Sequence, residues 1–332
     1  MHSQKILLVC SDPGSANCIS SLVRYLEPYK YILISSKIQF LPESLRDKAV
    51  LTKTVGEVEK LFNENKFSYV ITGTSVEDRL ELMCIKMAIA KNIKSMSFVD
   101  HWTAIGARFL MHGQVVLPDK VVVNDELAYK VACKEIGPER LLVLGNPYWE
   151  TIKSYKPSKS RAQIISELQL DETKKIVVFL SDNLCETFGS EREVVKELGF
   201  NEIQVFELVK EWTSLMGSYN LVLKLHPKES AAKFQRYDQI KMLDNYPLWD
   251  LFFVADFVVG MHSAAVLEAE IMAKKIIRVE PDARYNCLPT KCPRITMVEK
   301  GEQQFREFFT QPLEVLKCHH HFDVDSFQKE IS

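Results

Sequence analysis

The feature that most constrains this chain is a repeated alternation of short apolar runs with amphipathic stretches. In the first half, the short runs rich in Val, Ile and Leu are residues 5–10, 31–35, 69–73, 95–100, 120–124 and 141–146. Runs of this length are typical of strands buried on both faces of a parallel sheet. Stretches 76–92 and 125–137 open with acidic residues and carry an apolar face, which favours helices. The first half therefore predicts a doubly wound α/β domain.

Residues 147–160 interrupt this alternation. The segment PYWETIKSYKPSKS is rich in Pro, Ser and Lys and shows no apolar periodicity, so it predicts an interdomain linker. Beyond it, the candidate strands and helices are 174–182, 202–216, 220–227, 247–255, 256–263, 264–275, 276–280 and 294–298. We therefore predict two domains, residues 1–150 and 151–332. We expect ligands to bind in a central cleft, at the carboxyl ends of the strands.

Composition and missing motifs exclude several classes of protein. The 42 Lys and Arg residues nearly balance the 44 Asp and Glu residues, so nothing favours nucleic acid as a partner. No apolar run reaches the ~20 residues of a membrane span. The eight cysteines form no CxxC pair and no glycosylation sequon occurs, so we expect reduced thiols in a cytoplasmic protein.

Only 12 residues are glycine, and neither GxGxxG nor GxxxxGK[ST] occurs. This excludes the glycine-repeat fingerprints of dehydrogenases and P-loop proteins. The Asp-Val-Asp sequence at 323–325 lies in a polar tail rather than after a strand, so we expect no metal site there. We also expect no cofactor.

Two strand ends in the first half carry residues suited to binding a ligand. The first contains Asp12, Gly14, Ser15 and Asn17. Glycine would let the backbone approach a ligand, and the other three supply polar atoms. The same residues could instead form an ordinary strand-to-helix turn, with Ser15 or Asn17 as the N-cap.

The second strand end places Asp100 and His101 after a buried run, followed by Trp102 and Arg108. An imidazole near a carboxylate suits a general base, because His titrates near neutral pH. Adjacent strand residues point to opposite faces, so direct contact between Asp100 and His101 is not implied.

Two strand ends in the second half suit an anionic ligand. Lys224 and His226 alternate onto one side of a strand, where they could meet a phosphate, although Lys224 could equally be a surface charge. Gly260 ends another strand, and Ser263 opens a helix whose free N–H groups would receive an anion. Glu268, about one turn later, could accept ribose hydroxyls or lie on a solvated face.

The order of these segments resembles a known superfamily. LVLKLHP (221–227) followed by VVGMHSAAVLEAEIMAKKII (258–277) is similar to the C-terminal half of GT-B-fold glycosyltransferases and of the related UDP-sugar 2-epimerases. IVVFLSDN (176–183) resembles their first donor-domain strand, and VLGNPYWE (143–150) resembles the segment that leads into their linker. The chain has MHSAA where many members have a glycine-rich turn.

The resemblance implies two Rossmann-like doubly wound domains facing a central cleft. It implies a C-terminal domain that binds a nucleotide-sugar donor, UDP-linked by superfamily precedent, and an N-terminal domain that binds the acceptor. By position, the donor-binding residues would be Ser181, Asp182, Lys224, His226, Gly260, His262, Ser263, Ala264 and Glu268. The acceptor-binding residues would be Gly14, Ser15, Asn17, Trp102 and Arg108.

The function that the resemblance implies is metal-independent sugar transfer to a glycan or lipid-linked acceptor. Asp100 or His101, with Asp12 in reserve, would deprotonate the acceptor. The alternatives are a UDP-sugar 2-epimerase or hydrolase and a non-catalytic nucleotide- or glycan-binding protein. Phe40, Leu41 and Leu45 could touch a lipid-linked acceptor in a peripheral membrane contact, but we favour their packing on their own domain.

Overall fold

The computed structural model describes residues 5–27, 29–286, 288, 290, 292–311 and 320–332. Its contacts divide the chain into two units. Unit 1 comprises Met1–Thr151 and His320–Ser332, and unit 2 comprises Ile152–His319.

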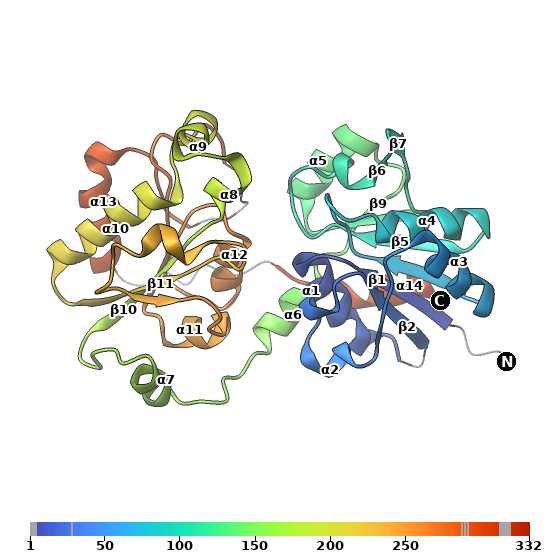
Figure 1. Ribbon diagram of the computed structural model, residues 1–332, viewed down its shortest axis with the longest axis horizontal. Coiled ribbons are helices and arrows are strands. Elements are labelled where there is room, and N and C mark those ends of the chain that lie inside the picture. Colours follow the sequence, from blue (N-terminus) through green and yellow to red (C-terminus); the bar gives the residue numbers. More distant parts are fainter. Residues whose placement is uncertain (1–4, 28, 287, 289, 291, 312–319) are drawn as a thin grey trace. The chain divides into compact units, whose positions relative to one another are not determined.

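Unit 1 is built on a seven-stranded sheet with the order β3-β2-β1-β4-β5-β8-β9, in which every pair is parallel (Figure 1). Its strands are β1 (Lys5–Cys10), β2 (Lys30–Ser35), β3 (Ala49–Leu51), β4 (Tyr69–Thr72), β5 (Lys94–Phe98), β8 (Lys120–Val123) and β9 (Leu141–Val143). The short hairpin β6 (Leu110–Met111) and β7 (Gln114–Val115) stands apart from this sheet. The sequence predicted each sheet strand except β3. The order reverses between β1 and β4, as in doubly wound folds.

Helices cover both faces of the unit 1 sheet because successive strand residues point to opposite sides. The helices of the unit are α1 (Pro13–Leu22), α2 (Glu43–Arg46), α3 (Val55–Glu64), α4 (Leu80–Ala90), α5 (Glu126–Ile136) and α14 (Val324–Ile331), and α6 (Pro147–Lys153) crosses from unit 1 into unit 2. Ile6 and Leu8 of β1 lie in a buried cluster with residues of α1 and α14. Leu7 and Val9 lie in a second cluster, with residues of α3 and α4. This two-sided burial explains the uninterrupted apolar run of β1.

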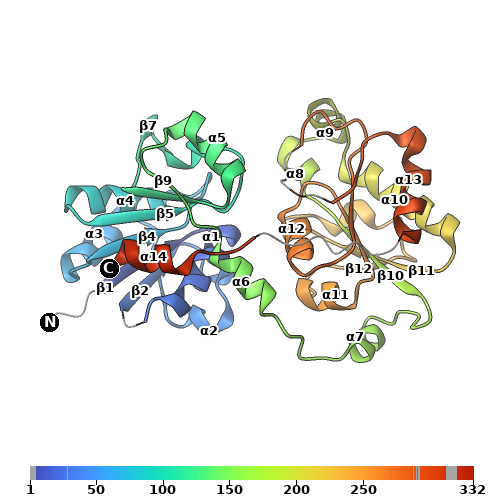
Figure 2. The same ribbon diagram turned by 180° about the vertical axis from the view of Figure 1, so that it is seen from behind.

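The C-terminal segment belongs to unit 1, so the prediction that 151–332 form one domain is wrong for residues 320–332 (Figure 2). Phe322 and Phe327 are buried in the cluster that contains Ile6. Phe322 also pairs with Gly145 in an antiparallel bridge. The Asp-Val-Asp segment is therefore no polar tail, since its first residue, Asp323, is the N-cap of α14. An amphipathic helix with a buried aromatic face docks where it can cover apolar surface.

Unit 2 has a six-stranded parallel sheet with the order β12-β11-β10-β13-β14-β15. Its strands are β10 (Lys175–Leu180), β11 (Tyr219–Lys224), β12 (Lys241–Leu243), β13 (Phe257–Gly260), β14 (Ile276–Val279) and β15 (Arg294–Ile295). Its helices are α7 (Arg161–Glu167), α8 (Leu184–Phe188), α9 (Glu191–Leu198), α10 (Glu202–Met216), α11 (Leu248–Val254), α12 (Ala264–Ile271) and α13 (Gly301–Thr310). The order reverses between β10 and β13, so both units have the predicted doubly wound topology.

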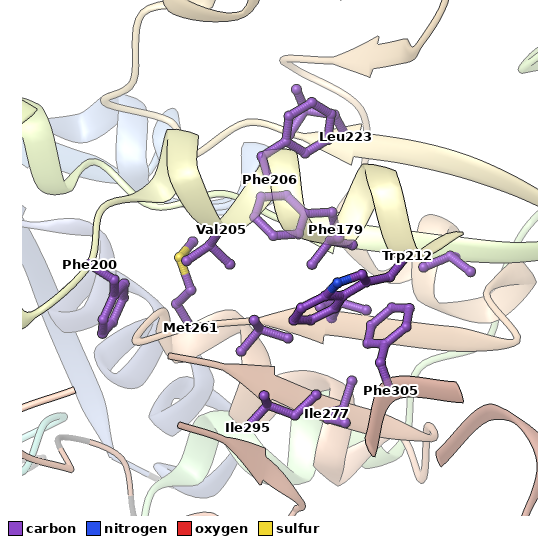
Figure 3. Close-up of a cluster of buried hydrophobic side chains, with 14 of the residues drawn as sticks. Phe179, Phe200, Val205, Phe206, Trp212, Leu223, Met261, Ile277, Ile295 and Phe305 are labelled. Carbon is purple, nitrogen blue, oxygen red and sulfur yellow. The ribbon is translucent and has the colours of Figure 1, made fainter. Parts of the chain in front are cut away.

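An aromatic core fills one face of the unit 2 sheet. Phe179 of β10 packs on Phe206 of α10 with ring centroids 5.2 Å apart, and Trp212 packs on Phe305 of α13 at 5.4 Å (Figure 3). Ile176 and Val178 point to the other face, toward α7, α11 and α12. The long helix α10 matches the predicted segment 202–216 at both ends.

The linker prediction is wrong for residues 147–153, which form α6 with Trp149 and Ile152 buried. Pro147 opens this helix, a position where its missing N–H costs nothing.

Leu41 and Leu45 are buried in the unit 1 core, in agreement with the packing that we favoured over a membrane contact. No helix within the described residues is long and apolar enough to cross a membrane.

Candidate functional site

Each sheet has a reversal point where the connections after two neighbouring strands lead to opposite faces of the sheet, and ligands of doubly wound proteins bind at such points. In unit 1 this point lies between β1 and β4, and in unit 2 it lies between β10 and β13.

In unit 1, the turn after β1 brings α1 close to the loop after β5. Asp12 is the N-cap of α1 and accepts a hydrogen bond from Ser15 N at 3.1 Å, so the cap is neither Ser15 nor Asn17. A Cβ atom on Gly14 would lie 1.8 Å from Asp100 Oδ2. Gly14 is therefore required for the close approach of the Asp100 carboxylate to α1.

Asp100 is held by two polar side chains. Arg108 Nη1 donates to Asp100 Oδ1 at 3.1 Å and to Thr74 Oγ1 at 3.2 Å. Asn124 Nδ2 donates to the Asp100 carbonyl at 3.0 Å. Burial, and next the charge of Asp100, raise the pKa of Asp12. The structure thus brings together the predicted residues Asp12, Gly14, Asp100 and Arg108, as two carboxylates beside one guanidinium.

His101 does not join this cluster through hydrogen bonds. Its Nδ1 accepts from Thr103 N at 3.3 Å and lies 2.9 Å from Thr103 Oγ1. Burial, and next the positive charge of Arg108, lower the pKa of His101 to about 4. Trp102 is 5% exposed and its Nε1 donates to both carboxylate oxygens of Asp125, at 2.9 and 2.8 Å. The strand-end position was therefore predicted correctly, but the indole of Trp102 faces its own domain rather than an open acceptor site.

Sequence reasoning missed a buried carboxylate behind α1. Ser11 Oγ donates to Glu81 at 2.6 and 2.7 Å, and Ser15 Oγ donates to Glu81 at 3.1 Å. Glu81 is 2% exposed, and burial raises its pKa to about 7. Ser15 is thus turned inward, while Asn17 is half-buried on α1. The signal for Glu81 was a single acid inside the apolar helix LELMCIKMAIA.

Unit 2 holds a pocket of about 310 Å³ at the carboxyl ends of its central strands. It is lined by residues that follow β10 and β11, by the loop before α11 and by the start of α12. These are Leu180, Ser181, Lys224, Leu225, His226, Pro227, Asp244, Asn245, Tyr246, Leu248, Ser263 and Ala265. Ser181, Lys224, His226 and Ser263 of the predicted donor-binding set therefore meet in one pocket.

The two basic residues of this pocket are both tied to backbone atoms. Lys224 Nζ donates to the carbonyls of Leu225 at 2.9 Å and Asp244 at 2.5 Å, and burial lowers its pKa. His226 Nδ1 accepts from Lys228 N at 3.1 Å. Burial, and next the charges of Lys228 and Lys224, lower the pKa of His226 to about 4. A neutral imidazole and a cation already bound to carbonyls therefore line the wall.

The start of α12 already holds a carboxylate. His262 N donates to Asp182 Oδ2 at 3.0 Å, where we expected a ligand anion. Asp182 is 5% exposed, and burial raises its pKa to about 7. Ser263 is the N-cap and accepts from Ala265 N at 3.3 Å, and Ala264 is the exposed first residue of the helix.

The remaining predicted residues have structural partners. A Cβ atom on Gly260 would lie 2.5 Å from Val266 Cγ2, so this glycine lets α12 pack on β13. Glu268 accepts from Trp249 Nε1 at 2.6 Å. The His262 ring stands edge-on to Phe200 with centroids 5.1 Å apart. For these residues, binding of a donor stays a prediction.

Sequence reasoning also missed two buried ionic groups in unit 2. Lys233 forms ion pairs with Glu186, Glu202 and Glu229 at 3.0, 2.5 and 2.8 Å. At the end of β14, the Glu280 carboxylate pairs with both Arg278 and Arg294. The sequence gives no sign of which charged residues are buried in the loop HPKES (226–230) and at the strand end RVE (278–280). Within the described ranges, no group of three or more His, Cys, Asp or Glu side chains could hold a metal ion.

No protein-family model matches the chain. Among curated proteins, the teichoic acid glycerol-phosphate primase of Bacillus subtilis (strain 168) is 29% identical over 163 residues. These residues are 48% of this chain and only 39% of the length of that relative.

Solved structures are similar over much more of the chain. The UDP-GlcNAc 2-epimerase of Methanocaldococcus jannaschii, in complex with UDP-GlcNAc and UDP, is 14% identical with a TM-score of 0.63 over 99% of each chain. A glycosyltransferase from Rickettsia africae is 11% identical with a TM-score of 0.61, over 93% of this chain and 89% of its own. The wall teichoic acid polymerase TagF with CDPG is 16% identical with a TM-score of 0.53, over 92% and 81%. The chain therefore has the GT-B fold, with two Rossmann-like units, that such glycosyltransferases and 2-epimerases share.

Proposed function

We propose that the chain is a glycosyltransferase whose nucleotide-sugar donor binds in unit 2. The observation that carries this proposal is the pocket at the reversal point between β10 and β13, lined by Ser181, His226 and Ser263. Nucleotides bind at this edge in doubly wound sheets. Tyr246 and Leu248 add an apolar wall that suits a base. UDP is our first candidate nucleotide, because the 2-epimerase of similar fold is bound to UDP-GlcNAc and UDP.

The proposed chemistry requires a leaving diphosphate and a base for the acceptor hydroxyl. Transfer breaks the anomeric C–O bond, and negative charge develops on the nucleoside diphosphate. Asp182 with a pKa near 7 is partly neutral at pH 7, which limits its repulsion of that charge at the start of α12. In unit 1, Asp12 is our preferred base, because burial raises its pKa, whereas Asp100 is paired with Arg108 and His101 Nδ1 already accepts from Thr103 N. The acceptor is a glycan or a lipid-linked sugar.

A second candidate is transfer of glycerol phosphate from a CDP-linked donor. The glycerol-phosphate primase is the relative that favours it, at 29% identity over about half of this chain. The polymerase TagF, whose structure contains CDPG, supports the same possibility. In this reaction a P–O bond of the donor diphosphate breaks and a nucleoside monophosphate leaves. The two candidates therefore differ in the nucleotide product.

The first experiment is a thermal-shift screen of the full chain with UDP, CDP, GDP and dTDP and their sugar or glycerol conjugates. A ligand at 100 times its Kd should stabilise the protein by ~2.7 kcal/mol, which is detectable. No shift with any of them would refute both candidates.

The second step identifies the nucleotide product. UDP release on addition of a glycan acceptor supports sugar transfer, CMP release supports glycerol-phosphate transfer, and an isomerised UDP-sugar without acceptor supports a 2-epimerase. Asp12→Asn should keep donor affinity and lose transfer. Full turnover in that variant would refute Asp12 as the base.

A further inference from the structure

We propose that Glu229 sets the hydrogen-bond polarity of Ser181, so that Ser181 accepts a hydrogen bond from a ligand hydroxyl and donates none to a phosphate. This inference rests on the proposed function, because it specifies how the unit 2 pocket reads its nucleotide donor. Glu229 acts as a positioning residue, and Ser181 is the residue that would touch the ligand.

Both carboxylate oxygens of Glu229 accept hydrogen bonds. Its Oε1 accepts from Ser181 Oγ at 2.6 Å and lies 2.8 Å from Lys233 Nζ. Its Oε2 accepts from His226 N at 2.8 Å. The Glu229 side chain is 0% exposed, so no water competes for these positions. Glu229 thereby ties the end of β10 to the end of β11.

The direction of the Ser181 hydrogen bond follows from these partners. Burial raises the pKa of Glu229, and the hydrogen bonds from Lys233, Ser181 and His226 oppose this effect. The backbone N–H of His226 and the ammonium of Lys233 can only donate, so they favour the ionised carboxylate, which can only accept. A serine hydroxyl has one proton and two lone pairs. Because the proton of Ser181 goes to Glu229, only lone pairs remain for a ligand in the pocket.

This polarity determines which part of a nucleotide donor can form a hydrogen bond with Ser181. Phosphate oxygens are acceptors and would meet the lone pairs of Ser181 unfavourably. A ribose or sugar hydroxyl can donate to them. We therefore place a hydroxyl-bearing part of the ligand at Ser181 and the phosphates at Ser263, which also lines the pocket.

Glu229→Gln tests this by reversing the polarity. His226 N and the Lys233 ammonium both need an oxygen, but Lys233 also pairs with Glu186 and Glu202. We therefore expect the amide oxygen to take the Oε2 position beside His226 N and the amide nitrogen to face Ser181. The amide nitrogen then donates to Ser181 Oγ, which releases the serine proton toward the pocket. A variant with only a structural defect would weaken all ligands alike, whereas reversed polarity moves a hydroxyl-bearing ligand and a bare anion in opposite directions.

The experiment measures the Kd of UDP, CDP and inorganic pyrophosphate for the full chain by titration calorimetry. Ser181→Ala should weaken the binding of the nucleotide about 2- to 12-fold, the effect of one neutral hydrogen bond, and leave the affinity for pyrophosphate unchanged. Glu229→Gln should weaken the binding of the nucleotide and tighten the binding of pyrophosphate. Glu186→Gln is the matched control, because Glu186 also pairs with Lys233 and carries the same charge but does not contact Ser181.

Each result decides the inference. Equal weakening of nucleotide and pyrophosphate binding by Ser181→Ala, or no weakening of the binding of UDP, CDP and UDP-glucose, overturns it and leaves the proposed function intact. If Glu186→Gln changes the ratio of the nucleotide Kd to the pyrophosphate Kd as much as Glu229→Gln does, the inference is also overturned, because net charge then explains the effect. If the wild type binds neither nucleotide, both the inference and the proposed function fail. Should Glu229→Gln not fold, Ser181→Ala alone decides.

A further pair of ligands identifies the hydroxyl. If Ser181→Ala weakens the binding of UDP and of UDP-glucose equally, the hydroxyl belongs to the ribose. If it weakens only the binding of UDP-glucose, the hydroxyl belongs to the transferred sugar.

Discussion

Glu81 allows a quantitative test of how burial acts on a carboxyl group in unit 1. Burial raises its pKa from 4.5 to about 7, and the hydrogen bonds from the Ser11 hydroxyl only partly offset that effect. A change of this size corresponds to about 3 kcal/mol between the two protonation states. The folded pKa lies above the unfolded one, so the folded state binds the proton more tightly. Stability from this group is therefore complete below pH 4.5 and is lost as the pH rises through about 7.

Glu81→Gln removes the titration while keeping the shape of the side chain and its capacity to bond both serines. We expect the free energy of unfolding of the variant, minus that of the wild type, to increase by about 3 kcal/mol between pH 4.5 and 8. The difference isolates Glu81, because the other titrating groups are common to both proteins. Urea unfolding followed by circular dichroism at several pH values measures it.

The control is Glu64→Gln, which removes an exposed acid on the neighbouring helix α3. Its difference from the wild type should stay flat with pH, since an exposed pair contributes little. A flat difference for Glu81→Gln, or one that grows toward low pH, would refute the reasoning that burial controls this carboxyl.

Three further predictions follow from single contacts. Asp182 loses its proton near pH 7, so the affinity for UDP-glucose should fall as the pH rises from 6 to 8. Asp182→Asn should make this affinity independent of pH, and an unchanged pH dependence in the variant would exclude Asp182 as the cause. Gly14→Ala places a methyl group 1.8 Å from Asp100 Oδ2, so it should displace that carboxylate beside Asp12 and lower transfer by roughly tenfold to a hundredfold with little change in unfolding temperature. Wild-type kinetics would count against a role for the Asp12 and Asp100 cluster. Gly145→Ala places a methyl group 1.7 Å from the His321 carbonyl at a φ of +83°, so hydrogen exchange in α14 should accelerate while exchange in α12 does not; equal protection of α14 would show that this bridge does not hold it.

Most strands could be predicted because each is an uninterrupted apolar run that needs burial on both faces. β1 spans residues 5–10 as predicted, and β10 and β14 differ from their predictions by one or two residues. The short edge strand β3 was missed because Val50 and Leu51 are exposed and the run is only three residues long. Helix α6 was missed because Pro and Lys in its sequence suggest a linker, whereas burial of Trp149 depends on partners distant in the sequence.

The candidate sites were predicted only as far as strand ends reveal them. Asp12, Asp100, Ser181 and His226 lie at strand ends, and the parallel order of each sheet brings such ends to one edge. Which partner each side chain chooses could not be predicted. Glu229 looks like an ordinary charged loop residue in HPKES (226–230), yet its side chain is fully buried against Ser181 and Lys233.

By itself, the sequence determined the alternation of strands and helices, the presence of two doubly wound units and the strand ends at which polar residues gather. Those properties depend on local periodicity and on apolar runs that cannot remain in water. Only the tertiary structure decided that α14 returns to unit 1, that Asp182 occupies the amide at the start of α12 and that Glu229 takes the proton of Ser181. Each of these depends on groups far apart in the chain meeting in a buried place, where an unpaired polar atom is costly and its partner determines its chemistry.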